Sequence, residues 1–155
     1  MRPAPLFLED LAIGQVFRAG PLTVAAEEII AFARQYDNQP FHTDPVAAAA
    51  HPVFQGLAAS GWHTTALMMS MVTQALGHLG WGVIGGGGEL SWARPVRPGD
   101  ALRLEIEVKE IAPSRSRPDR GSVLVENRLI NQHGEVVTRF TPRLVVPTRP
   151  PEEPA

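Results

Sequence analysis

The sequence contains no cysteine, and this absence excludes several classes of chemistry at once. Disulfide bonds, thiolate catalysis and cysteine-ligated zinc or iron–sulfur sites are ruled out for these 155 residues. A strong charge of either sign is missing as well, because the formal net charge is only -2. Such a chain creates no global field that attracts nucleic acid or an anionic membrane, so we expect neither as a partner.

Long apolar runs are also missing. The longest weakly polar stretch, residues 56–77, includes Gln, Ser, His and Thr and is too polar for a membrane span. Residues 1–5 show no apolar run of the signal-peptide kind. We therefore expect a soluble, cytoplasmic protein. The length and the 44% apolar share fit one domain, which we place at residues 1–146, with 147–155 as a disordered, proline-rich tail.

Helical patterns occupy the first half of the chain. Residues 24–36 carry apolar side chains at helical spacing beside charged ones, with Thr23 as a candidate cap. The Asp44-Pro45 pair predicts a short helix over 46–51, because proline is favoured at the first helical position. Residues 57–76 are free of proline and rich in Ala, Leu and Met, which predicts the longest helix. This helix is apolar on most sides and should be buried.

Strand patterns occupy the second half. Apolar and charged residues alternate strictly over 102–109, which indicates a half-buried strand. Residues 122–131 and 136–146 are two further strands joined by a turn, and 89–96 form a fourth. Helices followed by an antiparallel meander indicate an α+β fold. Because only the long helix is apolar enough to cover the sheet, we expect the sheet to wrap around it, as in the hotdog fold.

Unusual chemistry is concentrated around Pro40. Asp37 and His42 stand five residues apart on either side of this proline, which disfavours a helix through the preceding residue. The bent chain can therefore turn both side chains toward one point. A carboxylate and an imidazole that converge can hold a water molecule and move its protons. The spacing alone fits a capped loop with a surface histidine at least as well.

The beginning of the long helix is the second notable segment. Residues 54–64 are rich in glycine and other small residues, which allow a ligand to approach the backbone closely. The first N–H groups of a helix are unpaired, and the helix dipole adds positive potential there. Such donors would stabilise a thioester carbonyl that becomes an enolate, at about 3–4 kcal/mol for one donor. Tight packing through small residues is the alternative interpretation.

Three motifs together resemble those of the MaoC-like dehydratases, which include the (R)-specific enoyl-CoA hydratases. They are the Asp-x4-His loop, the small-Gly pair that opens a long helix, and Arg-Pro-Val-Arg-Pro-Gly-Asp at 94–100 before an alternating strand. The likeness extends from about residue 7 to residue 146. It implies a hotdog fold, a homodimer or dimer of dimers, and an acyl-CoA or acyl-carrier-protein thioester as ligand. It implies no metal and no other cofactor.

The resemblance also implies a reaction and its catalytic residues. Water is added across the Cα–Cβ bond of an unsaturated acyl thioester, such as an enoyl-CoA of fatty acid metabolism, to give the (R)-3-hydroxyacyl thioester. The reverse reaction is a dehydration. Asp37 and His42 match the catalytic pair, which would bind the water and move its protons. Which of the two is acid and which is base stays open, since a coupled pair can share the role. Gly61 matches the glycine whose N–H holds the thioester oxygen.

Two positions depart from the family pattern. Gln39 stands where the family usually has Asn, which keeps the amide, and Ser60 stands where it usually has His. We expect Gln39, Ser60, Gly61 and Trp62 to bind the substrate. The acyl chain would run along Trp62 and the methionines at 68–69, although methionines on a buried helix more often belong to the core.

Two other functions compete with a hydratase. A hotdog thioesterase needs a carboxylate on the central helix, and residues 57–79 contain no Asp or Glu. A non-catalytic acyl-CoA-binding or assembly subunit would need neither Asp37 nor His42, so their presence favours catalysis. The departures at Gln39 and Ser60 keep the binding interpretation open. No two histidines have the H-x-x-x-H spacing of helical zinc sites, so we expect no metal.

Overall fold

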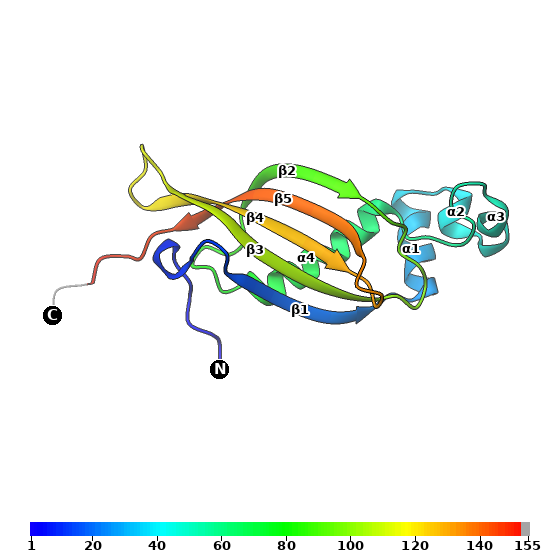
Figure 1. The fold of residues 1–155 in the computed structure, drawn as a ribbon, viewed down its shortest axis with the longest axis horizontal. Coiled ribbons are helices and arrows are strands. Elements are labelled where there is room, and N and C mark those ends of the chain that lie inside the picture. Colours follow the sequence, from blue (N-terminus) through cyan, green and yellow to red (C-terminus); the bar gives the residue numbers. More distant parts are fainter. Residues whose placement is uncertain (153–155) are drawn as a thin grey trace.

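The structure is a computed structural model that describes residues 1–152, and it consists of one antiparallel sheet and a set of helices (Figure 1). The five strands lie in the order β1-β3-β4-β5-β2. In chain order the elements are η1 (Leu8–Asp10), β1 (Val16–Thr23), α1 (Ala26–Tyr36), α2 (Pro40–Thr43), α3 (Pro45–Ala50), α4 (Gly61–Leu76), β2 (Gly85–Trp92), β3 (Ala101–Pro113), β4 (Arg120–Ile130) and β5 (Val136–Pro147).

The sheet curves around α4, which confirms the predicted hotdog fold (Figure 1). One face of α4 packs on the concave side of the sheet through Met68, Met71, Val72 and Leu76, which are all buried. The opposite face is not covered by any of the residues 1–152, and Trp62 is 58% exposed. Helices α1 to α3 lie beyond one end of the sheet, near the beginning of α4, while residues 1–5 and 148–152 lie at the other end. The first turn of α4 thus meets the three short helices.

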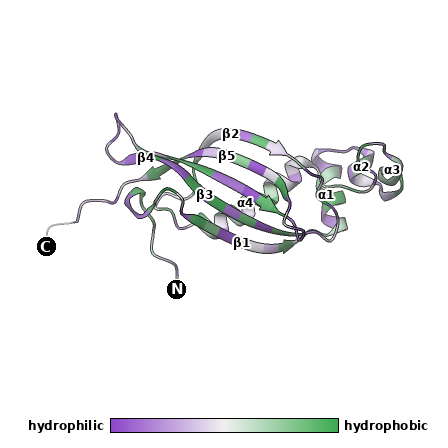
Figure 2. Cartoon of the chain, viewed as in Figure 1, coloured by the Kyte–Doolittle hydropathy of each residue, from purple (hydrophilic) through white to green (hydrophobic). Residues whose placement is uncertain are grey.

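The alternation predicted for β3 is confirmed. Its inward side chains are apolar and almost completely buried, and its outward ones are charged; the inward set is Leu102, Leu104, Ile106 and Val108. Figure 2 shows the same alternation as stripes across the neighbouring strands. Burial of each such side chain contributes about 1.5–3 kcal/mol. The register of the sheet is therefore fixed, because a slip by one residue would place charges in the core.

Two helix boundaries differ from the sequence prediction. Thr23 is the last residue of β1, so it does not cap α1, which begins at Ala26 without a side-chain cap. Helix α4 begins at Gly61, four residues later than predicted. The cause is Arg97, whose guanidinium binds carbonyl groups of the preceding segment, so those carbonyls are not free for helical bonds. Strand β2 likewise lies four residues earlier than predicted.

The predicted cap of α3 is confirmed. The Asp44 carboxylate accepts hydrogen bonds from the backbone N–H groups of Val46 and Ala47, and Pro45 occupies the first helical position.

The residues after β5 make contacts with the body of the protein. The Thr148 N–H donates to the Asp119 carbonyl at 2.9 Å, and the Arg149 side chain binds Asp10 at 2.5 Å. The predicted tail also includes residues 153–155, which lie outside the described residues. Within residues 1–152, no helix combines the length and the apolar character that crossing a membrane requires.

The register of β3 can be tested through the free energy of unfolding of the protein. We expect Leu104→Ala to lower the free energy of unfolding by about 2–5 kcal/mol, because it leaves a cavity beneath α4. Arg103→Ala, at the adjacent outward position, should change it by less than about 0.5 kcal/mol. Urea denaturation followed by circular dichroism measures both. Equal losses for the two variants would contradict the assigned faces.

Candidate active site

Asp37 and His42 converge at the junction of α1 and α2. Asp37 is the residue that ends α1, and Gln39 takes the extended conformation that a following proline favours. Pro40 then begins the single turn of α2, which carries His42. This sharp bend brings the Asp37 Oδ2 and the His42 Nε2 to within 3.4 Å of each other. The convergence predicted from the Asp-x4-His spacing is present in the structure.

His42 is held in one orientation and one tautomer. The side chain is only 6% exposed, which contradicts the alternative of a surface histidine. Its Nδ1 lies 2.6 Å from the carbonyl oxygen of Ala58. A carbonyl oxygen can only accept, so Nδ1 carries the proton and Nε2 of the neutral ring presents a lone pair. Phe41 and Phe54 pack against the ring edge-on. The proton-accepting nitrogen therefore faces Asp37.

Asp37 is a carboxylate supported by two neutral donors. Gln39 Nε2 donates to Oδ1 at 2.5 Å, and Ser60 Oγ donates to Oδ2 at 2.7 Å. Burial by itself raises the pKa of Asp37, but the hydrogen bonds from Gln39 and Ser60 and the proximity of His42 outweigh it. The pKa therefore lies below its ordinary value. Asp37 is ionised at neutral pH and can accept a hydrogen bond from a third group.

The first turn of α4 lies beside this pair. Ser60 is fully buried and caps α4, because its hydroxyl accepts from the Trp62 N–H at 3.3 Å while it donates to Asp37. Gly61 is the first helical residue, and its N–H makes no hydrogen bond to the described residues 1–152. This donor lies at the positive end of the α4 dipole. It is therefore available to an oxygen of a ligand.

At position 61, any residue larger than glycine would overlap the ring of Trp92. A Cβ built there would lie 2.5 Å from two ring atoms of Trp92, so any larger residue displaces the indole. Trp92 packs edge-on against Trp62 and donates from Nε1 to the Thr65 hydroxyl at 3.0 Å. The two indoles form a wall next to the free N–H group.

These groups surround one pocket of about 420 Å³. Five of the six residues predicted for the site line it: Asp37, Gln39, His42, Gly61 and Trp62. The sixth, Ser60, lies behind the wall and acts on Asp37 and on the helix. Thr138 also lines the pocket, and its buried hydroxyl has no partner among residues 1–152.

Two contributions to the site carry no signal in the sequence. The Ala58 carbonyl that fixes the histidine is a backbone group, which any residue could supply. Trp92 lies far along the chain and reaches Gly61 only because β2 folds over the first turn of α4.

Arg97, within the Arg-Pro-Val-Arg-Pro-Gly-Asp motif, binds the carbonyls of Phe54, Gly56 and Leu57 and thereby positions the segment before α4.

Comparisons with known proteins agree with one another. The MaoC like domain family matches residues 9–132. The crystal structure of the MaoC-like dehydratase from Rhodospirillum rubrum is 51% identical and covers 94% of this chain and 99% of its own, with a TM-score of 0.90. R-hydratase PhaJ1 from Pseudomonas aeruginosa is 26% identical, with 97% and 95% covered and a TM-score of 0.74. An (R)-hydratase from A. caviae involved in PHA biosynthesis is 29% identical, with 91% and 99% covered and a TM-score of 0.70.

The support of Asp37 by Ser60 can be tested by titration. In Ser60→Ala the carboxylate loses one of the hydrogen bonds that lower its pKa, so we expect that pKa to rise. Carbon-13 NMR of the Asp37 carboxyl against pH measures it. Ser70→Ala is the matched control, because the Ser70 hydroxyl on the same helix binds only the Leu67 carbonyl. An unchanged Asp37 pKa in Ser60→Ala would contradict the assigned hydrogen bond.

The same variant should show a pH-dependent loss of stability. Because the folded-state pKa of Asp37 is lowered, the ionised carboxylate stabilises the protein above its unfolded pKa, and this contribution is lost as pH falls through the folded pKa. The stability difference between wild type and Ser60→Ala should therefore be largest at neutral pH and smaller in acid. The part of the stability difference that comes from the lost cap of α4, about 1 kcal/mol, should remain at both neutral and acidic pH.

Proposed function

We propose, because this chain belongs to the MaoC-like domain family, that it is a hydratase or dehydratase of an unsaturated acyl thioester. The reaction proposed is the interconversion of an enoyl-CoA and an (R)-3-hydroxyacyl-CoA. The R-hydratases of similar fold support this reaction class. The observation that carries the proposal is the pairing of Asp37 with His42 Nε2 beside the free N–H of Gly61.

The 3.4 Å separation suits a shared water molecule. It is longer than the roughly 2.6–3.2 Å of a close hydrogen bond, so both groups keep acceptor capacity for a third partner. A water between them would donate one hydrogen to the Asp37 carboxylate and the other to His42 Nε2. Its oxygen lone pair would then be free to attack Cβ of the enoyl group.

The proton balance of hydration follows from this arrangement. As the water oxygen forms a bond to Cβ, one of its O–H bonds breaks and the proton passes to the Asp37–His42 pair. The Cα–Cβ electron pair moves into the thioester, and the carbonyl oxygen becomes negative. The pair then returns the proton to Cα. General acid–base assistance of this kind is worth about 10²–10⁴-fold in rate.

The negative oxygen needs a fixed donor. Gly61 N–H and the positive end of the α4 dipole would supply it, since both lie at the wall of the same pocket. Trp62 and Trp92 would flank the thioester. Gln39 and Ser60 would act through Asp37, which they hold ionised and oriented.

The thioester carrier proposed is CoA or an acyl-carrier protein, and the assembly proposed is a cytoplasmic homodimer or dimer of dimers. Two exposed indoles support an assembly, because Trp62 of α4 and Trp92 of the edge strand β2 are large apolar side chains with more than two fifths of their surface exposed.

The reaction can be tested with crotonyl-CoA and a panel of longer and branched enoyl-CoAs. Wild type should remove the enoyl absorbance, and Asp37→Asn and His42→Ala should each lower kcat/KM by about 10²–10⁴-fold. The first variant keeps the shape of the side chain but not its charge, and the second removes the proton acceptor.

Ser70→Ala serves as the control and should keep wild-type activity. Release of free CoA thiol, measured in parallel, would point to a thioesterase. Binding of enoyl-CoAs by calorimetry without any hydration would contradict the catalytic proposal and leave a binding or assembly subunit.

Gly61 offers a second test. In Gly61→Ala the added Cβ displaces the Trp92 ring, and we expect kcat/KM to fall by about 10–100-fold, because small displacements in a positioned site are costly. Gly86→Ala is the matched control, since a Cβ at Gly86 meets nothing within 4 Å. Full activity in Gly61→Ala would argue against a role of this helix start in holding the thioester.

A further inference from the structure

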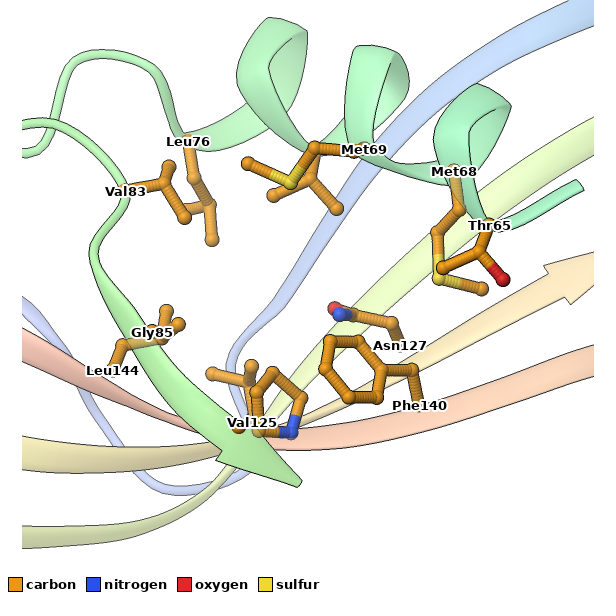
Figure 3. A pocket seen from close by; sticks show the side chains of 13 residues that line it. Thr65, Met68, Met69, Leu76, Val83, Gly85, Val125, Asn127, Phe140 and Leu144 are labelled. Carbon is orange, nitrogen blue, oxygen red and sulfur yellow. The ribbon is translucent and has the colours of Figure 1, made fainter. Parts of the chain in front are cut away.

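A second cavity, of about 270 Å³, lies further along α4 than the catalytic pocket. Figure 3 shows it between one face of α4 and the inner face of the sheet. The helix contributes Thr65, Met68, Met69, Val72 and Leu76. The catalytic pocket is lined by Gly61, Trp62 and Thr64 of the same helix, so the two hollows follow one another along α4. The second is smaller than the roughly 300–1,000 Å³ of a pocket for a whole ligand, which suits one end of a longer molecule.

The wall of this cavity is apolar except for two side chains, Thr65 and Asn127. The Thr65 hydroxyl is already engaged, because it donates to the Gly61 carbonyl at 2.8 Å and accepts from Trp92 at 3.0 Å. Asn127 is different. It is only 3% exposed, and its Oδ1 has no hydrogen-bond partner among the described residues.

Asn127 interrupts an otherwise apolar stripe. The inward residues before and after it on β4, Val125 and Leu129, are buried hydrophobic side chains. Its amide points into the cavity, next to Phe140 of the paired strand β5 (Figure 3). A buried polar group without a partner lowers stability, and such groups are rare in folded proteins unless a ligand or water pairs with them. The position of Asn127 therefore indicates a hydrogen-bonding partner inside the cavity.

We propose that this cavity receives the acyl chain of the thioester and that Asn127 selects chains bearing a neutral hydroxyl group. The inference rests on the proposed function, because the thioester end must occupy the catalytic pocket. The Asn127 amide can accept a hydrogen bond through Oδ1 and donate one through Nδ2, and a hydroxyl group can pair with either atom. A charged donor is excluded by the absence of any charged side chain in the lining, since an unpaired charge there would be strongly desolvated. A hydroxyl-substituted acyl chain fits both conditions.

The test compares matched pairs of 2-enoyl-CoAs that have equal length and differ only in a hydroxyl on carbon 5, 6 or 7. For one hydroxyl position, wild type should show a kcat/KM about tenfold higher than for the plain chain. In Asn127→Leu, which keeps the volume and removes the amide, the ratio should fall to one or below. Asn127→Ser, which keeps a polar group in a smaller side chain, should retain part of the preference.

Two readouts keep the outcome interpretable. Crotonyl-CoA has no chain beyond carbon 4, so Asn127→Leu should change its hydration far less than that of the hydroxyl-bearing chains. The thermal midpoint should rise because an unpaired polar group is removed. Met69→Leu is the matched control on the facing wall and should leave the hydroxyl preference as in wild type.

The two proposals can fail separately. If the enoyl-CoAs are hydrated but hydroxyl and plain chains react equally in wild type and Asn127→Leu, Asn127 holds only a water and the inference is wrong. If no enoyl-CoA is hydrated, the proposed function fails. Calorimetry with saturated acyl-CoAs then decides the inference: a hydroxyl preference that is lost in Asn127→Leu would uphold it, and equal binding of both chains would overturn it.

Discussion

The site depends on one short segment, Ala58–Gly61, which holds both Asp37 and His42 through hydrogen bonds. The Ala58 carbonyl fixes the proton on His42 Nδ1, and the Ser60 hydroxyl donates to Asp37. The next residue, Gly61, leaves its N–H free at the beginning of α4. The spacing of residues along this single segment therefore sets the distance between the Asp37–His42 pair, where we propose the water, and the Gly61 N–H, where we propose the thioester oxygen. Mutual attraction of Asp37 and His42 could not do this, because an electrostatic attraction between two groups does not fix their orientation relative to α4.

The fold keeps this segment in place from two sides. The Ala59 N–H donates to the Val96 carbonyl, and the Ala58 N–H donates to the Phe41 carbonyl, so the segment is tied both to the motif before β3 and to α2. Arg97 holds the carbonyls just upstream. Burial of α4 against the sheet then fixes the direction of the helix, and with it the position of its first N–H groups. The hydrophobic core and the site are linked through α4.

The sequence predicted the elements whose signal is local. Strict alternation identified β3, and the Asp44-Pro45 pair identified α3. The proline between Asp37 and His42 predicted their convergence, because its effect on the preceding residue is steric and acts whatever the surroundings. The resemblance to the MaoC-like dehydratases is shown to be correct by the match to residues 9–132.

Features that arise from distant contacts could not be predicted in this way. The proline-free apolar run predicts a beginning of α4 that is four residues too early, because the run does not reveal that its first carbonyls are bound by an arginine forty residues away. Ser60 is predicted to bind the substrate; in the structure it lies outside the pocket lining, and its hydroxyl donates to Asp37. Only the folded backbone shows on which side of the helix cap a serine lies. The contact of Trp92 with Gly61 likewise depends on the fold and has no local signal in the sequence.

The departure at Ser60 is accommodated by its surroundings. A hydroxyl is small enough to be fully buried and can both accept from the Trp62 N–H and donate to Asp37. Together with the Gln39 amide, it supplies two neutral donors to the carboxylate, so Asp37 stays ionised without a cation held permanently against it. Because these two donors carry no charge, they do not strongly favour one charge state of the pair when a proton moves between water, Asp37 and His42. A fixed cation in the same place would oppose the transfer of a proton to the carboxylate. The substitution is therefore consistent with acid–base chemistry at this pair, and differences in substrate preference are better sought further along α4, where the lining of the second cavity begins.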